Sequence, residues 1–310
     1  MKIMFMGTPD FAVFSLLSLH KAGHEIAAVI TQPDKPKGRG YTLTPPPVKV
    51  AATELHIPVY QPNTLKDEEF AKLIEEINPD ICVVVAYGKI LPKNVLDYPK
   101  YGCVNVHGSL LPEYRGAAPM QRAIIDGKSV TGITTMYMDV GLDTGDMLLI
   151  EEVPILEDDN FESIHDKLGE CGASLIVKTL AGLENGSIER KKQDESLATY
   201  AAKIQKSDCE ISFDMNAKKV HDLIRGLSPI PLSFTHTVDG KLLKITEARL
   251  VDTDTPHMTV GEVLSIDDGI TVACQTGAIN IRGVLPEGKG RMSTSDFVRG
   301  RKVNVGDILK

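Results

Sequence analysis

The sequence contains no tryptophan, and only five of its 310 residues are cysteine. The cysteines are scattered, odd in number and never form a C-x-x-C pair, which argues against a zinc site or a disulfide framework. This usage favours free thiols in a reducing cytoplasm. No apolar run approaches the length needed to span a membrane. These absences predict a cytoplasmic protein that has no metal site and makes no contact with a membrane.

The glycine-rich signatures of nucleotide-binding proteins are also missing. The predicted first strand, 2–6, runs into Gly7-Thr8-Pro9-Asp10, with one glycine where G-x-G-x-x-G would be required. The second predicted strand, 25–31, is followed by Gln32 and not by an acid that could bind ribose. A nicotinamide enzyme is therefore disfavoured. The β-α-β order still predicts a Rossmann-like sheet, with Thr8 as the N-cap of the intervening helix.

Length and composition indicate two domains. We expect residues 1–188 to form an α/β domain, with a mostly parallel sheet covered by helices on both faces. Strand 81–86 is the most apolar and should be central. Residues 189–206 are polar and charged, as is typical of a linker. In residues 207–310, short alternating strands separated by glycine turns predict an OB-like β-barrel, a frequent nucleic-acid-binding fold.

The net charge of −8 does not by itself favour a nucleic-acid partner, but its distribution is uneven. Residues 282–310 hold seven basic residues against three acidic ones. A long loop rich in proline and glycine, 32–47, and the helix after it carry further bases, namely Lys35, Lys37, Arg39 and Lys49. Such clusters can bind phosphates even in an acidic protein. A solvated face and a surface insertion are the alternative interpretations.

The stretch 104–118 holds the most informative residues. Asn105 and His107 are two apart in a predicted strand, so their side chains project from one face where the strand ends. An amide donor beside an imidazole suits a developing oxyanion and a moving proton. A histidine bonded to backbone, with an asparagine capping a turn, is the structural alternative. The turn 87–92 follows the neighbouring predicted strand and should lie close to His107.

An acidic loop follows the next predicted strand, 132–137. It contains Asp139, Asp143 and Asp146 among two glycines, and its spacing does not match a calcium-binding EF-hand. A carboxylate within reach of His107 would orient the imidazole and favour its charged form. The spacing does not decide which of the three acids occupies that position.

Together these motifs resemble the folate-dependent formyltransferases. The resemblance rests on Asn105-x-His107-x-Ser109-Leu110-Leu111-Pro112, on Arg115-Gly116-Ala117-Ala118-Pro119 and on Gly141-Leu142-Asp143-Thr144-Gly145-Asp146. Gly7-Thr8-Pro9-Asp10-Phe11, the basic loop and Pro286-Glu287-Gly288-Lys289-Gly290-Arg291-Met292 are similar to the branch that acts on methionyl initiator tRNA. The match extends over both predicted domains.

The resemblance implies transfer of a formyl group from 10-formyltetrahydrofolate to the α-amino group of methionyl initiator tRNA by a monomeric enzyme. It implies a catalytic triad of Asn105, His107 and Asp143. The implied folate contacts are Ser109, Leu110, Leu111, Pro112, Gly88, Lys89, Ile90, Leu91 and Val140. The implied tRNA contacts are Lys35, Lys37, Arg39, Lys49, Lys289 and Arg291.

Two alternatives remain at this level. A formyltransferase acting on a sugar nucleotide or a purine precursor would share the triad but would not need the basic loop. A non-catalytic RNA-binding module would need neither folate nor the triad. The chain also departs from the family pattern at Phe213, where tryptophan is usual, and at Ile230, where an aromatic residue is common. These departures affect the predicted tRNA-binding domain and not the predicted chemistry.

Overall fold

The computed structural model describes residues 1–37, 41–300 and 302–310, with the side chain of Lys37 excluded. Arg39 therefore lies outside the described residues. The chain divides into two compact units. The first comprises 1–116, 130–154 and 165–200, and the second comprises 117–129, 155–164 and 201–310.

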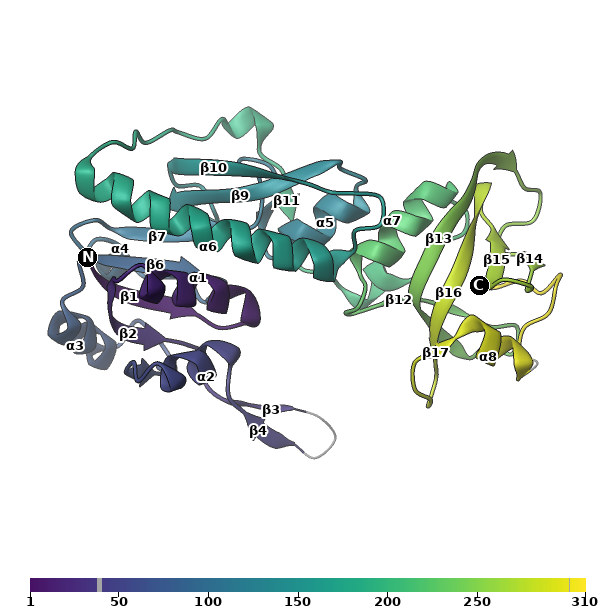
Figure 1. Cartoon of the computed structure of the whole chain (residues 1–310), viewed down its shortest axis with the longest axis horizontal. Helices are drawn as coiled ribbons and strands as arrows, with labels where there is room; N and C mark the ends of the chain where they lie inside the picture. Colours follow the sequence, from purple (N-terminus) through teal and green to yellow (C-terminus); the bar gives the residue numbers. More distant parts are fainter. Residues whose placement is uncertain (38–40, 301) are drawn as a thin grey trace. The chain divides into compact units, whose positions relative to one another are not determined.

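The first unit is built on a seven-stranded sheet in the order β10-β9-β7-β6-β1-β2-β5 (Figure 1). Every residue of the central strand β6 is buried, as its apolar sequence predicts. Neighbouring strands from β7 to β5 pair in parallel. At the other edge, β9 pairs antiparallel with both β7 and β10. The strands are β1 (Lys2–Gly7), β2 (Glu25–Ile30), β5 (Val59–Tyr60), β6 (Ile81–Val85), β7 (Cys103–His107), β9 (Val130–Tyr137) and β10 (Met147–Pro154).

Helices cover both faces of this sheet, as predicted. On one face, Phe70 of α3 and Leu96 of α4 are buried with Met4, Cys82 and other strand residues. On the other face lie α1 and α6, and the absence of a side chain at Gly172 lets α6 approach the sheet. The helices are α1 (Asp10–Lys21), α2 (Pro47–Glu54), α3 (Glu68–Ile77), α4 (Lys93–Leu96) and α6 (Phe161–Asn185).

The prediction that Thr8 caps α1 was wrong. Pro9 occupies the N-cap position and no side chain caps the helix. The Thr8 hydroxyl instead donates to the carbonyl oxygen of Tyr87, 3.1 Å away, in the turn after β6. The hydroxyl therefore links the end of β1 to the turn after β6 and does not cap the helix.

Four strands of the first unit were not predicted, and the shortest of them is β8 (Arg115–Gly116). The expected loop 32–47 contains a hairpin of β3 (Lys35–Lys37) and β4 (Thr42–Thr44), and α2 begins at Pro47. The longest of the four, β10, pairs antiparallel with β9. The β3 and β4 segments are three residues each, too short for an alternation to be recognised, so their pairing carries little local signal.

The second unit is an antiparallel sheet in the order β12-β13-β16-β15-β14, with β17 paired to β16. Its short strands agree with the predicted alternation, whereas β17 and α8 were not predicted. The unit contains β12 (Ser233–His236), β13 (Leu242–Pro256), β14 (Val263–Ser265), β15 (Ile270–Ala273), β16 (Thr276–Pro286), β17 (Met292–Ser293), α5 (Pro119–Ile125), α7 (Ala217–Gly226), α8 (Thr294–Arg299) and the 3₁₀ turn η2 (Lys206–Cys209). Its core joins the apolar face of α7 to the inner face of the sheet.

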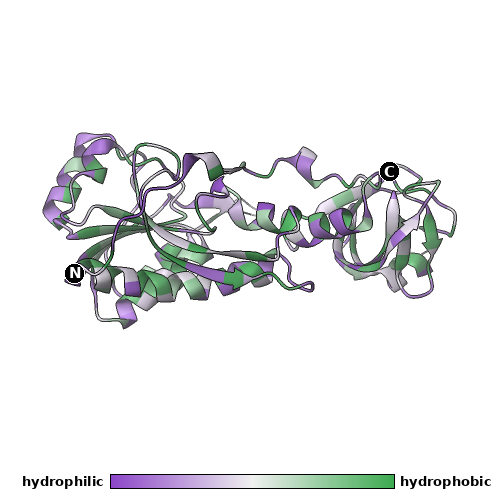
Figure 2. Ribbon diagram, turned by 90° about the horizontal axis from the view of Figure 1, so that it is seen from above, coloured by the Kyte–Doolittle hydropathy of each residue, from purple (hydrophilic) through white to green (hydrophobic). Residues whose placement is uncertain are grey.

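Figure 2 shows hydrophobic residues concentrated along the strands of the sheets and on the helix faces that pack against them. Among the described residues, none of the helices combines the length and the apolar character that crossing a membrane would require.

Candidate active site

Strand β7 places Asn105 and His107 on one face of the first unit's sheet. His107 is buried, with 6% of its side chain exposed, and Asn105 is half-buried. Because Val84 of β6 pairs with Asn105, the chain that follows β6 reaches the level of His107. The turn 87–92 therefore begins beside the end of β7, and its proximity to His107 stays a prediction.

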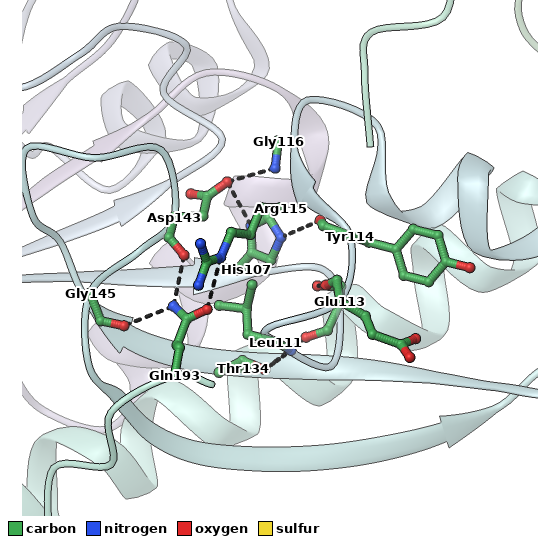
Figure 3. Close-up of polar contacts among 11 residues, drawn as sticks. His107, Leu111, Glu113, Tyr114, Arg115, Gly116, Thr134, Asp143, Gly145 and Gln193 are labelled. Atoms are coloured by element: carbon green, nitrogen blue, oxygen red, sulfur yellow. Dashed lines mark hydrogen bonds and ion pairs between the residues drawn. The ribbon is translucent and has the colours of Figure 1, made fainter. Parts of the chain in front are cut away.

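Both ring nitrogens of His107 face oxygen atoms (Figure 3). Nε2 lies 3.0 Å from the carbonyl oxygen of Tyr114, which can only accept, so Nε2 donates this hydrogen bond. Nδ1 lies 3.8 Å from Oδ2 of Asp143, close enough for an ion pair but too far for a hydrogen bond. The hydrogen bond requires a proton on Nε2, and Nδ1 is the ring nitrogen that faces the carboxylate.

The carboxylate beside His107 belongs to Asp143, the choice that the spacing left open. Its Oδ2 accepts a hydrogen bond of 2.8 Å from the backbone amide of Gly116. Asp139 is directed elsewhere and accepts from the amide of Val140. Asp143 has a φ of 53°, a left-handed conformation that residues other than glycine seldom adopt.

The antiparallel direction of β9 explains how this loop reaches His107. Tyr137, at the end of β9, pairs with Val104 near the beginning of β7. The loop therefore starts beside the beginning of β7 and must return along the strand to bring Asp143 to its end. The sequence predicted the loop and its acids, but strand direction is a property of the assembled sheet.

Residues Ser109 to Pro112, the predicted folate-contacting segment, are held by hydrogen bonds to β9. The Thr134 hydroxyl donates to the carbonyl oxygen of Ser109 at 2.8 Å and accepts from the amide of Leu111 at 3.1 Å. The Ser109 hydroxyl donates to the carbonyl oxygen of Glu113. Leu110 packs over Gly132, where a Cβ atom would lie 2.4 Å from the Leu110 side chain.

The turn after β6 contains the other predicted folate residues. The ammonium of Lys89 donates to the carbonyl oxygens of Pro62 and Asn63. Burial is the main cause that lowers the pKa of Lys89, and the positive charge of Lys35 lowers it further. Leu91 is buried, whereas Ile90 is 82% exposed. Val140, on the loop that carries Asp143, is 70% exposed. Two of the predicted folate residues therefore present apolar side chains outward.

The predicted tRNA contacts differ in whether an acidic side chain already pairs with their charge. Lys35 is exposed on β3, and Lys289 and Arg291 are exposed in the turn between β16 and β17. Lys49 instead pairs with Asp34 at 2.9 Å and also donates to Gln61. Its charge is already balanced, which makes it a weaker phosphate ligand than the exposed bases.

The segment 189–206, predicted to be a linker, supplies contacts to the site that its sequence did not indicate. Gln193 donates to the backbone carbonyl oxygens of Asp143 and Gly145, and Arg115 donates to Gln193 (Figure 3). The only local signal in this segment was its polarity, and polarity alone does not distinguish a solvated linker from a segment that packs against the site. Among the residues that the structure describes, no group of three or more His, Cys, Asp and Glu side chains is placed to hold a metal ion.

Comparison with known proteins agrees with this geometry. The model of the formyl transferase family matches residues 1–180, and that of the formyl transferase C-terminal domain matches residues 203–302. The methionyl-tRNA formyltransferase of Acetivibrio thermocellus is 46% identical over 310 residues, which cover 100% of this chain and 99% of that protein. The chain belongs to the methionyl-tRNA formyltransferase family. The resemblance inferred from the motifs is confirmed.

Other members and solved structures support the family and the fold. The methionyl-tRNA formyltransferase of Syntrophus aciditrophicus is 47% identical over 308 residues, 99% of this chain and 98% of that one. An N-formyltransferase from Helicobacter canadensis, solved with folinic acid and dTDP-3-aminofucose, has a TM-score of 0.67 at 19% identity and covers 91% of this chain and 98% of its own. HypX from Aquifex aeolicus, solved with tetrahydrofolic acid, has a TM-score of 0.66 at 18% identity, over 97% of this chain and 47% of its own. At these identities the two structures show the fold alone.

Proposed function

We propose that this chain transfers a formyl group from 10-formyltetrahydrofolate to the α-amino group of methionyl initiator tRNA in the cytoplasm. The observation that carries the chemistry is His107, placed between the Tyr114 carbonyl and the Asp143 carboxylate, beside Asn105. The acceptor is supported by the full-length identity to methionyl-tRNA formyltransferases.

In this proposal, Asn105 and His107 stabilise the charge that develops on the formyl oxygen as the neutral amine attacks. Nε2 of His107 is committed to Tyr114, so Nδ1 supplies the proton that faces the reaction. Removing one such donor typically costs about 10²–10³ in rate. Asp143 favours the imidazolium and, directly or through water, helps to move the amine proton to the leaving nitrogen.

The described residues fit a flat, partly apolar co-substrate. Ile90 and Val140 expose apolar side chains on the turn beside His107 and on the loop that carries Asp143, and a planar ring could cover them. Residues 109–112, which follow the end of β7, would supply backbone that hydrogen bonds to Thr134 keep ordered. The co-substrate supplies the activated formyl group, and the protein supplies its position and its electrostatic environment.

For the tRNA, we propose a division of labour between residues 1–188, which perform the chemistry, and the OB-like domain 207–310, which binds RNA, joined by residues 189–206. The exposed bases Lys35, Lys289 and Arg291 support this proposal, because phosphate contacts dominate affinity for nucleic acids. Lys37 and Arg39 are proposed as further tRNA contacts on the basis of sequence alone.

The test is formyl transfer from 10-formyltetrahydrofolate to methionyl initiator tRNA, with uncharged initiator and elongator methionyl-tRNA as controls. Transfer to the charged initiator alone is the expected result. If folate binds but no tRNA is formylated, the acceptor in this proposal is wrong, and sugar nucleotides become the next acceptors to try. If folate does not bind, the chemistry in this proposal is wrong.

A further inference from the structure

Backbone groups of residues 114–116 bind the proposed catalytic side chains of His107 and Asp143. Segment 193–199 in turn makes hydrogen bonds to residues 114–116. Tyr114 binds the imidazole through its carbonyl oxygen, and Gly116 binds the carboxylate through its amide. The amide of Tyr114 donates to the Thr199 hydroxyl at 2.8 Å, and the amide of Arg115 donates to the Thr199 carbonyl oxygen at 2.9 Å. The segment is therefore part of the support of the site.

Gln193 makes the most direct of these contacts. Its Nε2 donates to the carbonyl oxygen of Asp143 at 2.7 Å and to that of Gly145 at 2.8 Å, while its Oε1 accepts from Nε of Arg115 at 3.0 Å. A guanidinium can only donate, so Oε1 must face Arg115 and both amide protons must face the loop. One side chain thus binds the loop at two points on either side of Thr144.

Arg115 fixes the orientation of that amide. Its side chain is 0% exposed, and its two terminal nitrogens donate to the two carboxylate oxygens of Glu195 at 2.9 and 2.8 Å. A buried charge is costly unless it is paired, and the two parallel hydrogen bonds to the Glu195 carboxylate pair the charge of Arg115. The same hydrogen bonds lower the pKa of the Glu195 carboxyl.

The loop needs such a support because of the conformation of Asp143. A non-glycine residue in the left-handed region is strained and persists only where its surroundings hold it. Rotating this backbone unit would carry the carboxylate away from His107. We propose that Gln193, oriented by the Arg115–Glu195 pair, is a positioning residue for formyl transfer that holds the Asp143 backbone in register with the imidazole. The inference rests on the proposed function.

The first test is Gln193→Glu, which keeps the side-chain shape and removes both protons that face the loop. We expect kcat for formyl transfer to fall between about 10- and 100-fold, because a shift of about 1 Å in a catalytic group can cost 10² in rate. The KM for folate and for tRNA should stay within about threefold of wild type, since Gln193 contacts neither in this proposal. Asn185→Asp is the matched control, because it makes the same chemical change at an exposed position and keeps the acceptor for Ser187.

A double-mutant cycle separates positioning from general support of the fold. If Gln193 acts through Asp143, Gln193→Glu should cost less than about threefold in an Asp143→Asn background. An equal loss in both backgrounds would overturn the inference, as would an unchanged kcat in the single variant. Glu195→Gln provides a second route at an exposed side chain, should Gln193→Glu fail to fold. It should lower kcat less and show the same dependence on Asp143.

Amide hydrogen exchange of the peptide 138–147 gives a readout that does not need turnover. Exchange in this peptide should be faster in Gln193→Glu than in wild type and unchanged in Asn185→Asp. Wild-type protein that transfers no formyl group would refute the proposed function, whatever this exchange shows. Active wild-type protein whose peptide 138–147 exchanges equally in Gln193→Glu would refute the inference alone.

Discussion

Asp143→Asn tests the electrostatic role of the carboxylate beside His107. The substitution removes one charge and preserves the side-chain size. The asparagine carbonyl can still accept the hydrogen bond from the Gly116 amide, so the loop should keep its conformation. The loss is then confined to the interaction with the imidazole, which the wild-type carboxylate makes at 3.8 Å.

The expected size follows from Coulomb's law. Two unit charges about 4 Å apart interact by about 4 kcal/mol at an effective dielectric constant of about 20. If most of this interaction is realised when His107 is charged in the transition state, kcat should fall by about 10²–10³, since 1.36 kcal/mol corresponds to tenfold in rate. Folate affinity should change little, because the geometry of the loop is retained.

The assay is single-turnover formyl transfer to saturating methionyl initiator tRNA, with folate binding measured separately by titration. Single-turnover conditions isolate the chemical step from product release. If Asp143→Asn keeps its rate within about threefold of wild type, the reasoning from charge and distance is wrong. A loss of folate affinity equal to the loss of rate would place Asp143 in the binding of the co-substrate instead.

Three further outcomes follow from the same structure. Gly145→Ala would place a Cβ 1.9 Å from the Tyr137 carbonyl oxygen, so the loop must move, and we expect kcat to fall by up to about 100-fold in the transfer assay. Glu195 has a lowered pKa because Arg115 donates to it, so it stabilises the fold above its unfolded pKa, and this contribution is lost as the pH falls through its folded pKa. Melting curves from about pH 6 down to about pH 3.5 should therefore show less acid-induced loss of stability in Glu195→Gln than in wild type, and parallel curves would contradict this. Lys289→Ala should lower the magnitude of the slope of log affinity for tRNA against log salt by about 1. Lys49→Ala should lower it less, because Asp34 already pairs that charge. Equal slopes for the two variants would count against Lys289 as the stronger phosphate contact.

Much of the fold was predictable because the information is local. The short, β-branched apolar run of β6 and the alternation in the second unit predict buried strands from residues that are neighbours in the chain. The β-α-β order predicts parallel pairing without reference to any distant residue. The strands β3 and β4, which pair only with each other, were missed because three residues carry little periodic signal. The cap of α1 was wrongly predicted, since the Thr8 hydroxyl donates to Tyr87, which lies 79 positions away in the chain.

The candidate site divides along the same line. Asn105 and His107 share a strand, so the alternation of side chains along that strand places them together before any fold is known. Asp143 could not be chosen over Asp139 and Asp146 from spacing alone. The resemblance to a family made that choice, and the structure then showed the path of the loop beside β7.

The sequence by itself determined the two kinds of sheet, the pair Asn105 and His107, and the acidic loop, because each depends on residues a few positions apart. Only the tertiary structure decided which carboxylate faces the imidazole and which residues support it. Gln193 lies 50 positions from Asp143 along the chain, and a hydrogen bond between such residues leaves no periodic trace. Bonds of this kind exist only once the chain has folded, because local sequence patterns do not encode contacts between distant segments.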